Sequence, residues 1–310
     1  MNRPEERETA SLVAAQHGTI LRGIGSFYSI LSRSDGNVYT VRAKKKFRRQ
    51  SISPLVGDEV LFLPGQGEED GWLEEICPRT SVCIRPPAAN ITQLLIVIAP
   101  VPSPDLLLVD RLMIQARKQG IRCALVISKC DLDTELALRM REEYAQADCR
   151  VLPVSSMTGE GCDEVKSVMR GELNCLAGQS GVGKSTLLNR LFGLQEETGQ
   201  ISEKIQRGKN TTRRAEMFVV EDIRVLDTAG FSLLEMEEVM DPVLLKEAYP
   251  EFEPMEGQCR FQPCYHDREP GCAVTDAVLR GAIPEARVQR YRRILADVRT
   301  NWKERYQKYL

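Results

Sequence analysis

The chain has 310 residues, of which 42% are hydrophobic and 28% are charged, and its formal net charge is −2. A single hydrophobic core rarely grows beyond about 250 to 300 residues, so we expect two or three domains. The composition is ordinary for a globular protein and excludes a disordered or membrane-embedded class. The apolar runs are too short to span a bilayer and the N-terminal residues contain no apolar signal segment, so we expect a cytoplasmic protein.

Basic residues gather in two segments of the chain. Arg42 to Arg49 (RAKKKFRR) holds six basic residues and no acid, and Arg287 to Leu310 holds eight basic residues against Asp297 and Glu304. These segments flank a more acidic middle and are candidates for contact with phosphates. A solvated charged surface is the ordinary alternative.

The first domain is predicted to be a small β-barrel over residues 17–82, after a tail over residues 1–16. Short segments that alternate apolar and polar residues, separated by Gly, Asp and Pro, predict its strands. These segments are Gly18 to Ile24, Ser26 to Leu31, Val38 to Arg42, Glu59 to Leu63 and Gly71 to Ile76.

A second domain is predicted over residues 83–240, where apolar strand candidates alternate with helical stretches. This pattern indicates a mostly parallel sheet with helices on both faces. One helix should begin after Pro104 and stop near Gly120, because apolar residues recur between them at helical spacing. The strand candidates are residues 93–99, 123–129, 150–155, 173–178, 217–220 and 223–227.

Two polar motifs end strands in the first half of this domain. Ser128-Lys129-Cys130-Asp131 follows the apolar run CALVI, and Ser155-Ser156 follows VLPV. The Asp131 carboxylate can accept hydrogen bonds from guanine N1–H and the exocyclic amine, with Lys129 along the base and the Ser155-Ser156 backbone at O6. Adenine would leave a buried carboxylate unpaired and be rejected. Taken alone, such a tetrapeptide more often starts a helix with an acidic cap.

A phosphate-binding loop is predicted at Gly178 to Ser185 (GQSGVGKS), which matches the pattern G-x-x-x-x-G-K-[ST]. It follows an apolar strand and opens a helical segment, as a true P-loop must, whereas a chance Gly-rich turn is the alternative. Backbone N–H groups converge on the phosphates, Lys184 reaches the β- and γ-oxygens, and the Ser185 hydroxyl ligates Mg²⁺. The predicted nucleotide-binding residues of this segment are Gly178, Gln179, Ser180, Gly181, Val182, Gly183, Lys184, Ser185 and Thr186.

Two further motifs are expected to sense the γ-phosphate. Asp227-Thr228-Ala229-Gly230 ends the strand IRVL, where Asp227 can hold Mg²⁺ through water and the Gly230 N–H can meet the γ-phosphate. The polar loop GKNTTRR offers Thr212, with Thr211 as the weaker choice, as a Mg²⁺ ligand that depends on GTP, although it can also be a plain surface loop. The predicted catalytic residues are Lys184, Asp227, Gly230 and Thr212, and the predicted Mg²⁺ ligands are Ser185, Thr212 and Asp227.

A third domain is predicted over residues 241–310, with a Cys/His cluster followed by a basic helix. Cys259, Cys264, His266 and Cys272 follow the spacing C-x₄-C-x-H-x₅-C, a closed tetrahedral set suited to one structural Zn²⁺. Metal binding can supply folding energy to a segment with little core of its own. Buried or disulfide-bonded cysteines are the alternative, but the other cysteines are scattered like reduced thiols.

The order of these motifs resembles the ribosome small subunit-dependent GTPase A family. The base-reading motifs precede the P-loop, which makes the GTPase domain circularly permuted; the β-barrel precedes both and the Cys/His cluster follows. The resemblance covers nearly the whole chain. It includes Gly57-Asp58, Arg85-Pro86-Pro87, Ala89-Asn90 and Asp110-Arg111.

The resemblance implies a multidomain α/β fold: an N-terminal OB-like β-barrel, a circularly permuted P-loop GTPase domain and a C-terminal zinc-binding helical domain. It implies hydrolysis of GTP to GDP and phosphate, as a switch in late maturation of the small (30S) ribosomal subunit, with Mg²⁺ accompanying GTP. Binding to rRNA through the barrel and the basic segments, and a monomeric state, are further expectations.

Several positions depart from the family pattern. Ser128 stands where Asn is usual, which removes an amide hydrogen-bonding partner for guanine. Asn210 stands where many members have His, and Ala229 where Pro is usual. Phe231 occupies the place of the water-positioning Gln of classical GTPases, so we expect slow turnover until a partner accelerates it. The resemblance implies that this partner is the small ribosomal subunit.

Two other functional classes stay open. In a P-loop ATPase or small-molecule kinase, Asp131→Asn would leave nucleotide preference unchanged. In an RNA-binding assembly factor with a vestigial nucleotide site, Lys184→Ala would change neither turnover nor release from the ribosome.

Overall fold

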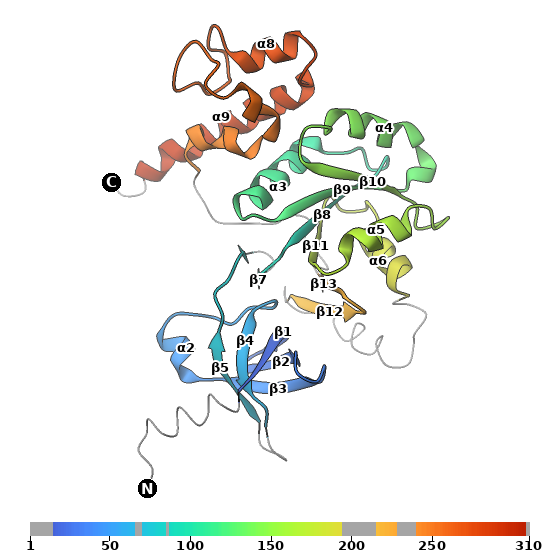
Figure 1. Ribbon diagram of the computed structural model, residues 1–310, viewed down its shortest axis with the longest axis vertical. Coiled ribbons are helices and arrows are strands. Elements are labelled where there is room, and N and C mark those ends of the chain that lie inside the picture. Colours follow the sequence, from blue (N-terminus) through green and yellow to red (C-terminus); the bar gives the residue numbers. More distant parts are fainter. Residues whose placement is uncertain (1–14, 66–69, 85–86, 194–214, 228–239, 308–310) are drawn as a thin grey trace.

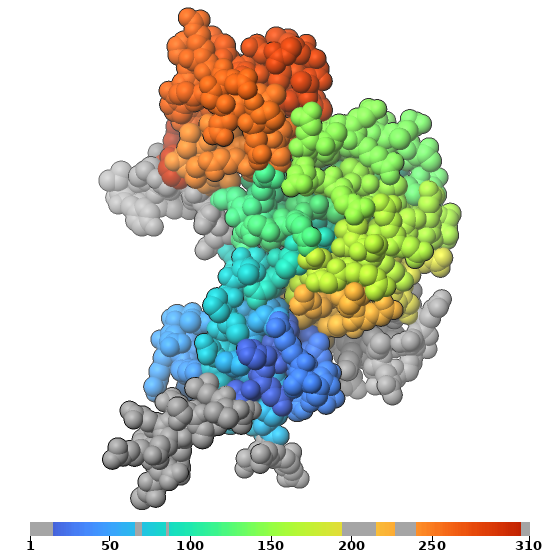
Figure 2. Space-filling view, in the orientation of Figure 1, coloured from blue at the N-terminus to red at the C-terminus, as the bar shows by residue number. Residues whose placement is uncertain are grey.

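The structure is a computed structural model, and it describes residues 15–65, 70–84, 87–193, 215–227 and 240–307. Three bodies follow one another along the long axis of the molecule: the N-terminal barrel, the central sheet with its helices, and the C-terminal helical unit (Figures 1 and 2). None of the described helices is long and apolar enough to cross a membrane. The domain boundaries given above stay predictions.

The barrel has five strands that close on themselves. They pair in the order β1-β2-β3-β5-β4, and β1 also pairs with β4. Ile20, Ile30 and Val41, from three different strands, are fully buried inside because alternate residues of a strand face the same side. The predicted barrel is therefore confirmed. The elements are β1 (Gln16–Ile24), β2 (Phe27–Ser32), β3 (Val38–Ala43), α2 (Lys45–Arg49), β4 (Glu59–Leu63) and β5 (Gly71–Ile76).

The central sheet has the strand order β10-β9-β8-β11-β13-β12. Its first five strands are parallel and β12 is antiparallel to β13. The elements are β8 (Gln93–Ile98), α3 (Leu106–Lys118), β9 (Arg122–Ser128), η1 (Cys130–Leu132), α4 (Thr134–Glu143), β10 (Cys149–Val154), α5 (Cys162–Met169), β11 (Leu173–Ala177), α6 (Lys184–Phe192), β12 (Glu216–Val220) and β13 (Ile223–Asp227).

Helices cover both faces of this sheet, as the sequence predicts. Side chains of α3 and α4 share one apolar cluster with one face, and side chains of α5 and α6 share a second cluster with the other. The chain winds outward from β8 through β9 to β10, then returns to β11 and continues to β13 on the other side. The winding thus reverses between β8 and β11. In open α/β sheets such a reversal places the binding crevice at the carboxyl ends of these strands.

The barrel joins the central sheet through backbone contacts. β1 pairs with β12 at Arg22 and Glu216, which makes one continuous eleven-stranded sheet. Near β7 (Ala88–Ala89), which pairs with β6 (Val82–Cys83), the Ala89 N–H donates to the Val56 carbonyl at 2.9 Å. Gly57 has a φ of +89°, and a Cβ there would lie 2.2 Å from the Ala89 carbonyl oxygen. Only glycine fits at this position, which explains physically why the chain has Gly57 there.

The C-terminal unit packs on helix α3. Ile114 of α3 belongs to the same apolar cluster as Tyr249, Phe252 and Tyr291 of the C-terminal unit. The unit consists of η2 (Pro242–Ala248), η3 (Pro250–Met255), α8 (Ala273–Leu279) and the long helix α9 (Glu285–Gln307).

A buried cluster of charges holds α9 against α3. Asp110 is 1% exposed and Arg287 is 2% exposed, and they form an ion pair. Arg290 Nε donates to Asp110 Oδ2 at 2.6 Å, and Tyr144 Oη donates to Asp110 Oδ1 at 2.8 Å. Burial by itself lowers the pKa of Arg287, but the Asp110 and Glu251 carboxylates raise it overall, so the guanidinium stays charged.

The basic helix is therefore only partly available to an external partner. Arg287 and Arg290 face the carboxylates of the cluster, and Arg299 pairs with Asp267 at 2.9 Å. Arg292 contacts Thr275 at 3.1 Å. Among the described side chains of α9, Arg293 and Lys303 are exposed cations. Among the side chains of the helix that the structure describes, the expected contact with phosphates is thus limited to Arg293 and Lys303.

Candidate nucleotide site and metal cluster

The P-loop lies at the carboxyl end of β11, at the reversal between β8 and β11. Gly178 has a φ of +137°, and a Cβ there would lie 2.1 Å from the Val97 carbonyl oxygen of β8. Gly183 has a φ of +97° and precedes α6, so Lys184 is the first residue of that helix. Glycine is required where the loop touches β8 and where its backbone turns into the helix.

Lys184 reaches back over the loop. Its Nζ donates to the carbonyls of Gly178 at 2.7 Å and Gln179 at 2.8 Å, and burial lowers the pKa of its ammonium group. Ser185 and Thr186 are exposed on the first turn of α6, whereas Val182 is fully buried. The Val182 side chain therefore packs into the core, and only its backbone can serve a phosphate.

Gln179 has a contact that the sequence does not reveal. Its Oε1 accepts from the Asp105 N–H at 2.9 Å, and its Nε2 donates to the Ser103 carbonyl at 3.2 Å. The side chain thus braces the P-loop against the segment between β8 and α3. Asp105 also caps α3 by accepting from the Leu108 N–H at 3.0 Å. No sequence motif marks the 103–105 segment, so only the fold shows that it supports the loop.

The base-reading motif touches the P-loop directly. Lys129, with a φ of +56°, donates from Nζ to the Gly181 carbonyl at 2.8 Å and to the Val101 carbonyl at 2.7 Å. Ser128 is 2% exposed, and its Oγ would lie 3.1 Å from a Cβ at Gly183. Segments some fifty residues apart along the chain therefore meet at one edge of the sheet.

The alternative interpretation of the base-reading motif, an acidic helix cap, belongs to a different residue. Asp133 caps α4, because its Oδ1 accepts from the N–H groups of Glu135 at 2.9 Å and Leu136 at 3.1 Å. Asp131 lies in the short helix η1 and is exposed. Among the described residues no donor hydrogen-bonds to Asp131, so its carboxylate is available to a ligand.

The second base loop is held by its own hydrogen bonds. Ser155 is fully buried, its Oγ accepts from the Thr158 N–H at 3.2 Å, and its carbonyl accepts from the Gly159 N–H at 2.8 Å. Ser156 Oγ is buried without a hydrogen-bond partner in the described part of the chain. Ser155 therefore shapes the loop, and Ser156 retains an unused hydroxyl.

The γ-phosphate motifs are only partly described. Asp227 is the last residue of β13, whose Leu226 is in register with Cys175 of β11, so its backbone reaches the same edge of the sheet. The Asp227 side chain, Gly230, Thr212 and the departures at Asn210, Ala229 and Phe231 lie outside the described residues. Their predicted roles stay predictions.

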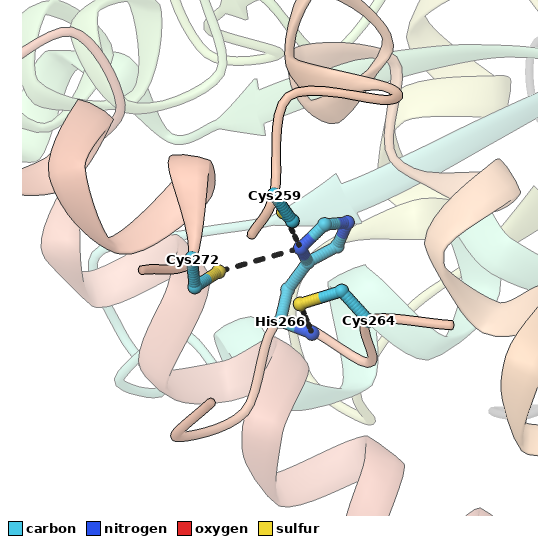
Figure 3. A group of neighbouring side chains, drawn as sticks. All are labelled: Cys259, Cys264, His266 and Cys272. Atoms are coloured by element: carbon cyan, nitrogen blue, oxygen red, sulfur yellow. Dashed lines mark hydrogen bonds between the residues drawn. The ribbon is translucent and has the colours of Figure 1, made fainter. Parts of the chain in front are cut away.

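The Cys/His cluster of the C-terminal unit converges on one point (Figure 3). The ligand atoms of Cys259, Cys264, His266 and Cys272 all lie within 4.8 Å of one another, and all four residues are buried. His266 Nδ1 is 3.4 Å from Cys272 Sγ and 3.6 Å from Cys259 Sγ. Burial lowers the pKa of His266, which favours the neutral imidazole that a metal requires.

The donor set fits zinc. Three thiols and one imidazole are a usual closed set for structural Zn²⁺. The N–H groups of His266 and Ala273 each donate to a ligand sulfur, Cys264 and Cys259 respectively, at 3.4 Å. None of the ten cysteines forms a disulfide in the structure, so the disulfide alternative finds no support there. The four residues thus form a cluster that can bind a zinc ion.

Comparisons with known proteins agree with this geometry. A family model described as RsgA GTPase matches residues 76–237, and one described as RsgA N-terminal domain matches residues 17–73. The chain is 40% identical over 280 residues to the small ribosomal subunit biogenesis GTPase RsgA of Ruminiclostridium cellulolyticum, covering 89% of this chain and 92% of that protein. It is 41% identical over 289 residues to the protein of the same name from Moorella thermoacetica, covering 91% and 97%.

Two solved structures share the fold. YjeQ from Thermotoga maritima superposes with a TM-score of 0.80 at 28% identity, covering 92% of this chain and 98% of that one. YloQ, described as a circularly permuted GTPase, superposes with a TM-score of 0.75 at 30% identity, covering 92% and 96%. Together with the family models, these relatives establish that the chain belongs to the RsgA GTPase family.

Proposed function

We propose that this chain hydrolyses GTP to GDP and phosphate and acts as a switch in late maturation of the small (30S) ribosomal subunit, through rRNA binding. One contact carries the proposal: Lys129 Nζ donates to the Gly181 carbonyl at 2.8 Å. This contact joins the base-reading motif to the phosphate-binding loop, so one nucleotide can be held at both ends. The relatives are named small ribosomal subunit biogenesis GTPases, and we infer the small subunit as partner from that name.

Each end of the nucleotide has its own residues in this proposal. The available Asp131 carboxylate accepts from guanine N1–H and the exocyclic amine, and the Ser155-Ser156 backbone meets O6. The P-loop backbone, from Gly178 to Ser185, surrounds the phosphates. Lys184 exchanges its two carbonyl partners for phosphate oxygens, because a charged acceptor forms the stronger hydrogen bond with an ammonium group.

Catalysis rests on charge stabilisation. Ser185, Thr212 and Asp227 are the residues proposed to hold Mg²⁺, which when bound would neutralise negative charge on the phosphates. Lys184 stabilises the same charge, and the Gly230 N–H contacts the γ-phosphate. Phe231 is apolar and cannot orient the attacking water, so turnover stays slow until the small subunit is bound.

The remaining parts of the proposal concern assembly. One structural Zn²⁺ in the Cys/His cluster maintains the C-terminal unit. The protein acts as a monomer in the cytoplasm. GTP orders the loop that contains Thr212 and fixes the flanking domains on rRNA, and hydrolysis releases them.

The test is phosphate release from GTP and from ATP, with and without small ribosomal subunits. We expect slow GTP-selective turnover that the subunit accelerates. Asp131→Asn should lower kcat/KM for GTP by about 10- to 100-fold, since the exocyclic amine of guanine then faces an amide N–H and lacks its acceptor. The same variant should accept xanthosine triphosphate, whose C2 carbonyl can take a hydrogen bond from the new amide.

Asp133→Asn is the matched control, because Asp133 caps α4 and lies two residues from Asp131. It should leave the choice of nucleotide unchanged. An Asp131→Asn protein with unaltered preference for GTP would support the ATPase or kinase class instead. Unaltered turnover in Lys184→Ala would indicate a vestigial site.

A further inference from the structure

A cleft of about 900 Å³ lies on the outside of the barrel, between α2 and strands β3 and β5. In Figure 1, α2 stands beside the barrel, next to β5. The cleft is separate from the nucleotide site, which lies in the central domain. Its lining includes Arg42, Lys44, Lys45, Arg48, Trp72 and Glu74.

Strand register aligns two aromatic rings with an arginine on this surface. Phe27 of β2 is in register with Arg42 of β3, and Arg42 is in register with Trp72 of β5. Residues in register face the same side of a sheet. Leu73 is fully buried in the barrel core, so Trp72 faces outward. The row Phe27–Arg42–Trp72 therefore crosses three strands on the outer surface.

The rings of this row are open to solvent. Trp72 is 45% exposed and Phe27 is 38% exposed, and the Arg42 guanidinium lies 4.7 Å from the centre of the Phe27 ring. Flat aromatic surface beside a cation is what proteins use to stack an unpaired nucleobase.

A buried carboxylate oxygen in the wall of the cleft lacks a donor. Glu74, two residues after Trp72, also lines the cleft and is 6% exposed. Its Oε2 pairs with Lys44 Nζ at 2.5 Å, whereas its Oε1 has no hydrogen-bond partner among the described residues. An unsatisfied buried acceptor destabilises the free protein, and a ligand N–H group would remove this cost.

The rim of the cleft is positively charged. Helix α2 exposes Lys45, Lys46, Arg48 and Arg49, and none of them forms an ion pair with a described residue. Arg42 is paired with Asp70 and Lys44 with Glu74. The unpaired cations therefore lie on the helix, at one side of the aromatic row, where the phosphates beside a stacked base would run.

We propose that this cleft binds one unstacked nucleotide of a single-stranded RNA. The base stacks on Trp72, a base N–H group donates to Glu74 Oε1, and the neighbouring phosphates contact Lys45 and Arg48. A duplex cannot enter in this way because its bases already cover one another's faces and edges. The inference rests on the proposed function insofar as rRNA is the source of the strand.

The first test uses the fluorescence of Trp72 itself. The chain has two tryptophans, so the Trp302→Phe variant leaves Trp72 as its single indole reporter. Titration with a single-stranded 12-nucleotide RNA should quench this emission, because a stacked base quenches an indole, and the same RNA as a duplex should not. Binding of the single strand with unchanged emission would overturn the proposal.

Affinity measurements locate the site. Trp72→Ala should weaken binding of the labelled 12-nucleotide RNA roughly 5- to 150-fold, the range measured for loss of one stacking side chain. Phe261→Ala is the matched control, since Phe261 is 50% exposed and lies under Arg260 in the C-terminal unit. Arg48→Ala should reduce the slope of log affinity against log salt concentration by about 0.7, the value for one lost phosphate contact on a single strand. Arg141→Ala, which removes an exposed arginine of α4, should leave this slope unchanged. Equal affinities for Trp72→Ala and Phe261→Ala would contradict the assignment.

The hydrogen bond to Glu74 has a separate readout. The protein should bind an oligouridine more tightly than the same oligomer of N3-methyluridine, which has no base N–H. In Glu74→Ala the difference between the two oligomers should disappear. Absence of this difference in the unaltered protein would overturn the role of Glu74.

The two proposals fail in different ways. If small subunits do not stimulate the unaltered protein, the proposed function fails. If stimulation is normal while single-stranded RNA leaves Trp72 emission unchanged, only the cleft assignment fails.

Discussion

The central domain is attached to the barrel on one side and to the C-terminal unit on the other, by contacts of different kinds. Toward the barrel, backbones meet: β1 pairs with β12, and Gly57 lies against the Ala89 carbonyl. Two ion pairs also cross this junction. Arg22 and Glu216 are 3.6 Å apart and about 40% exposed, and Arg224 and Glu59 are 3.8 Å apart and about a quarter exposed. Toward the C-terminal unit, buried side-chain charges meet instead.

The two junctions should respond differently to amino-acid substitutions. A backbone junction tolerates loss of any one side chain but not an added atom that pushes the chains apart. A buried ion pair fails when either partner is removed, because the remaining charge is left without water or counterion.

Zinc removal should have the largest effect. A structural zinc site contributes on the order of 10 to 16 kcal/mol to folding of small zinc domains. A chelator, or Cys264→Ser, should abolish amide-exchange protection in the C-terminal unit while the barrel and the central sheet stay protected. Cys77→Ser, outside the cluster, is the control. Retained protection of α8 after complete zinc removal would contradict this prediction.

Asp110→Ala should loosen the C-terminal unit from α3. Loss of one partner of a buried ion pair costs about 3 to 5 kcal/mol. Amide exchange in α9 should accelerate accordingly, without loss of zinc. Asp297→Ala is the control at the same interface, because its pair with Arg111 is about half exposed and should cost less than about 1 kcal/mol. Equal effects of the two variants would argue against a dominant buried cluster.

Gly57→Ala should damage the barrel junction. The new Cβ would lie 2.2 Å from the Ala89 carbonyl oxygen at a φ of +89°, so both contact and backbone strain oppose it. We expect a loss of about 1 to 3 kcal/mol in the free energy of unfolding, measured by denaturant titration. Gly36→Ala is the control, because Gly36 has a φ of +70° and open space around it. It introduces backbone strain alone, so the difference between the two variants gives the effect of the contact with Ala89.

Arg22→Ala should have the smallest effect. An exposed ion pair contributes about 0 to 1 kcal/mol, and the β1–β12 backbone pairing remains. Denaturant titration should therefore give nearly the same midpoint as for the unaltered chain. A loss as large as that of Gly57→Ala would indicate that side chains, not backbone, hold this junction.

The sequence predicts the fold well where the signal is local. Alternating segments identify the barrel strands, and apolar periodicity finds the helix from Leu106 to Lys118 to within a few residues. From sequence alone, the motif Ser128-Lys129-Cys130-Asp131 can either read guanine or cap a helix. The structure shows that Asp133, and not Asp131, caps α4. The brace from Gln179 to Asp105 has no sequence signal, because a glutamine in a P-loop can point in several directions.

The sequence is least informative about which charged residues are paired in the folded protein. Eight basic residues near the C-terminus look alike along the chain, yet Arg287 is buried in an ion pair with a residue 177 positions away. A composition count cannot separate cations that meet carboxylates from cations that meet solvent.

The order of the motifs, the spacing of the zinc ligands and the glycines of the P-loop can be read from the chain alone, because each depends on a few neighbouring residues. Which charges are paired, which strand residues share a surface and where distant loops meet depend on the folded structure. Phe27, Arg42 and Trp72 lie side by side only because three strands pair in a particular register. Register is set by closure of the whole barrel and not by any short segment.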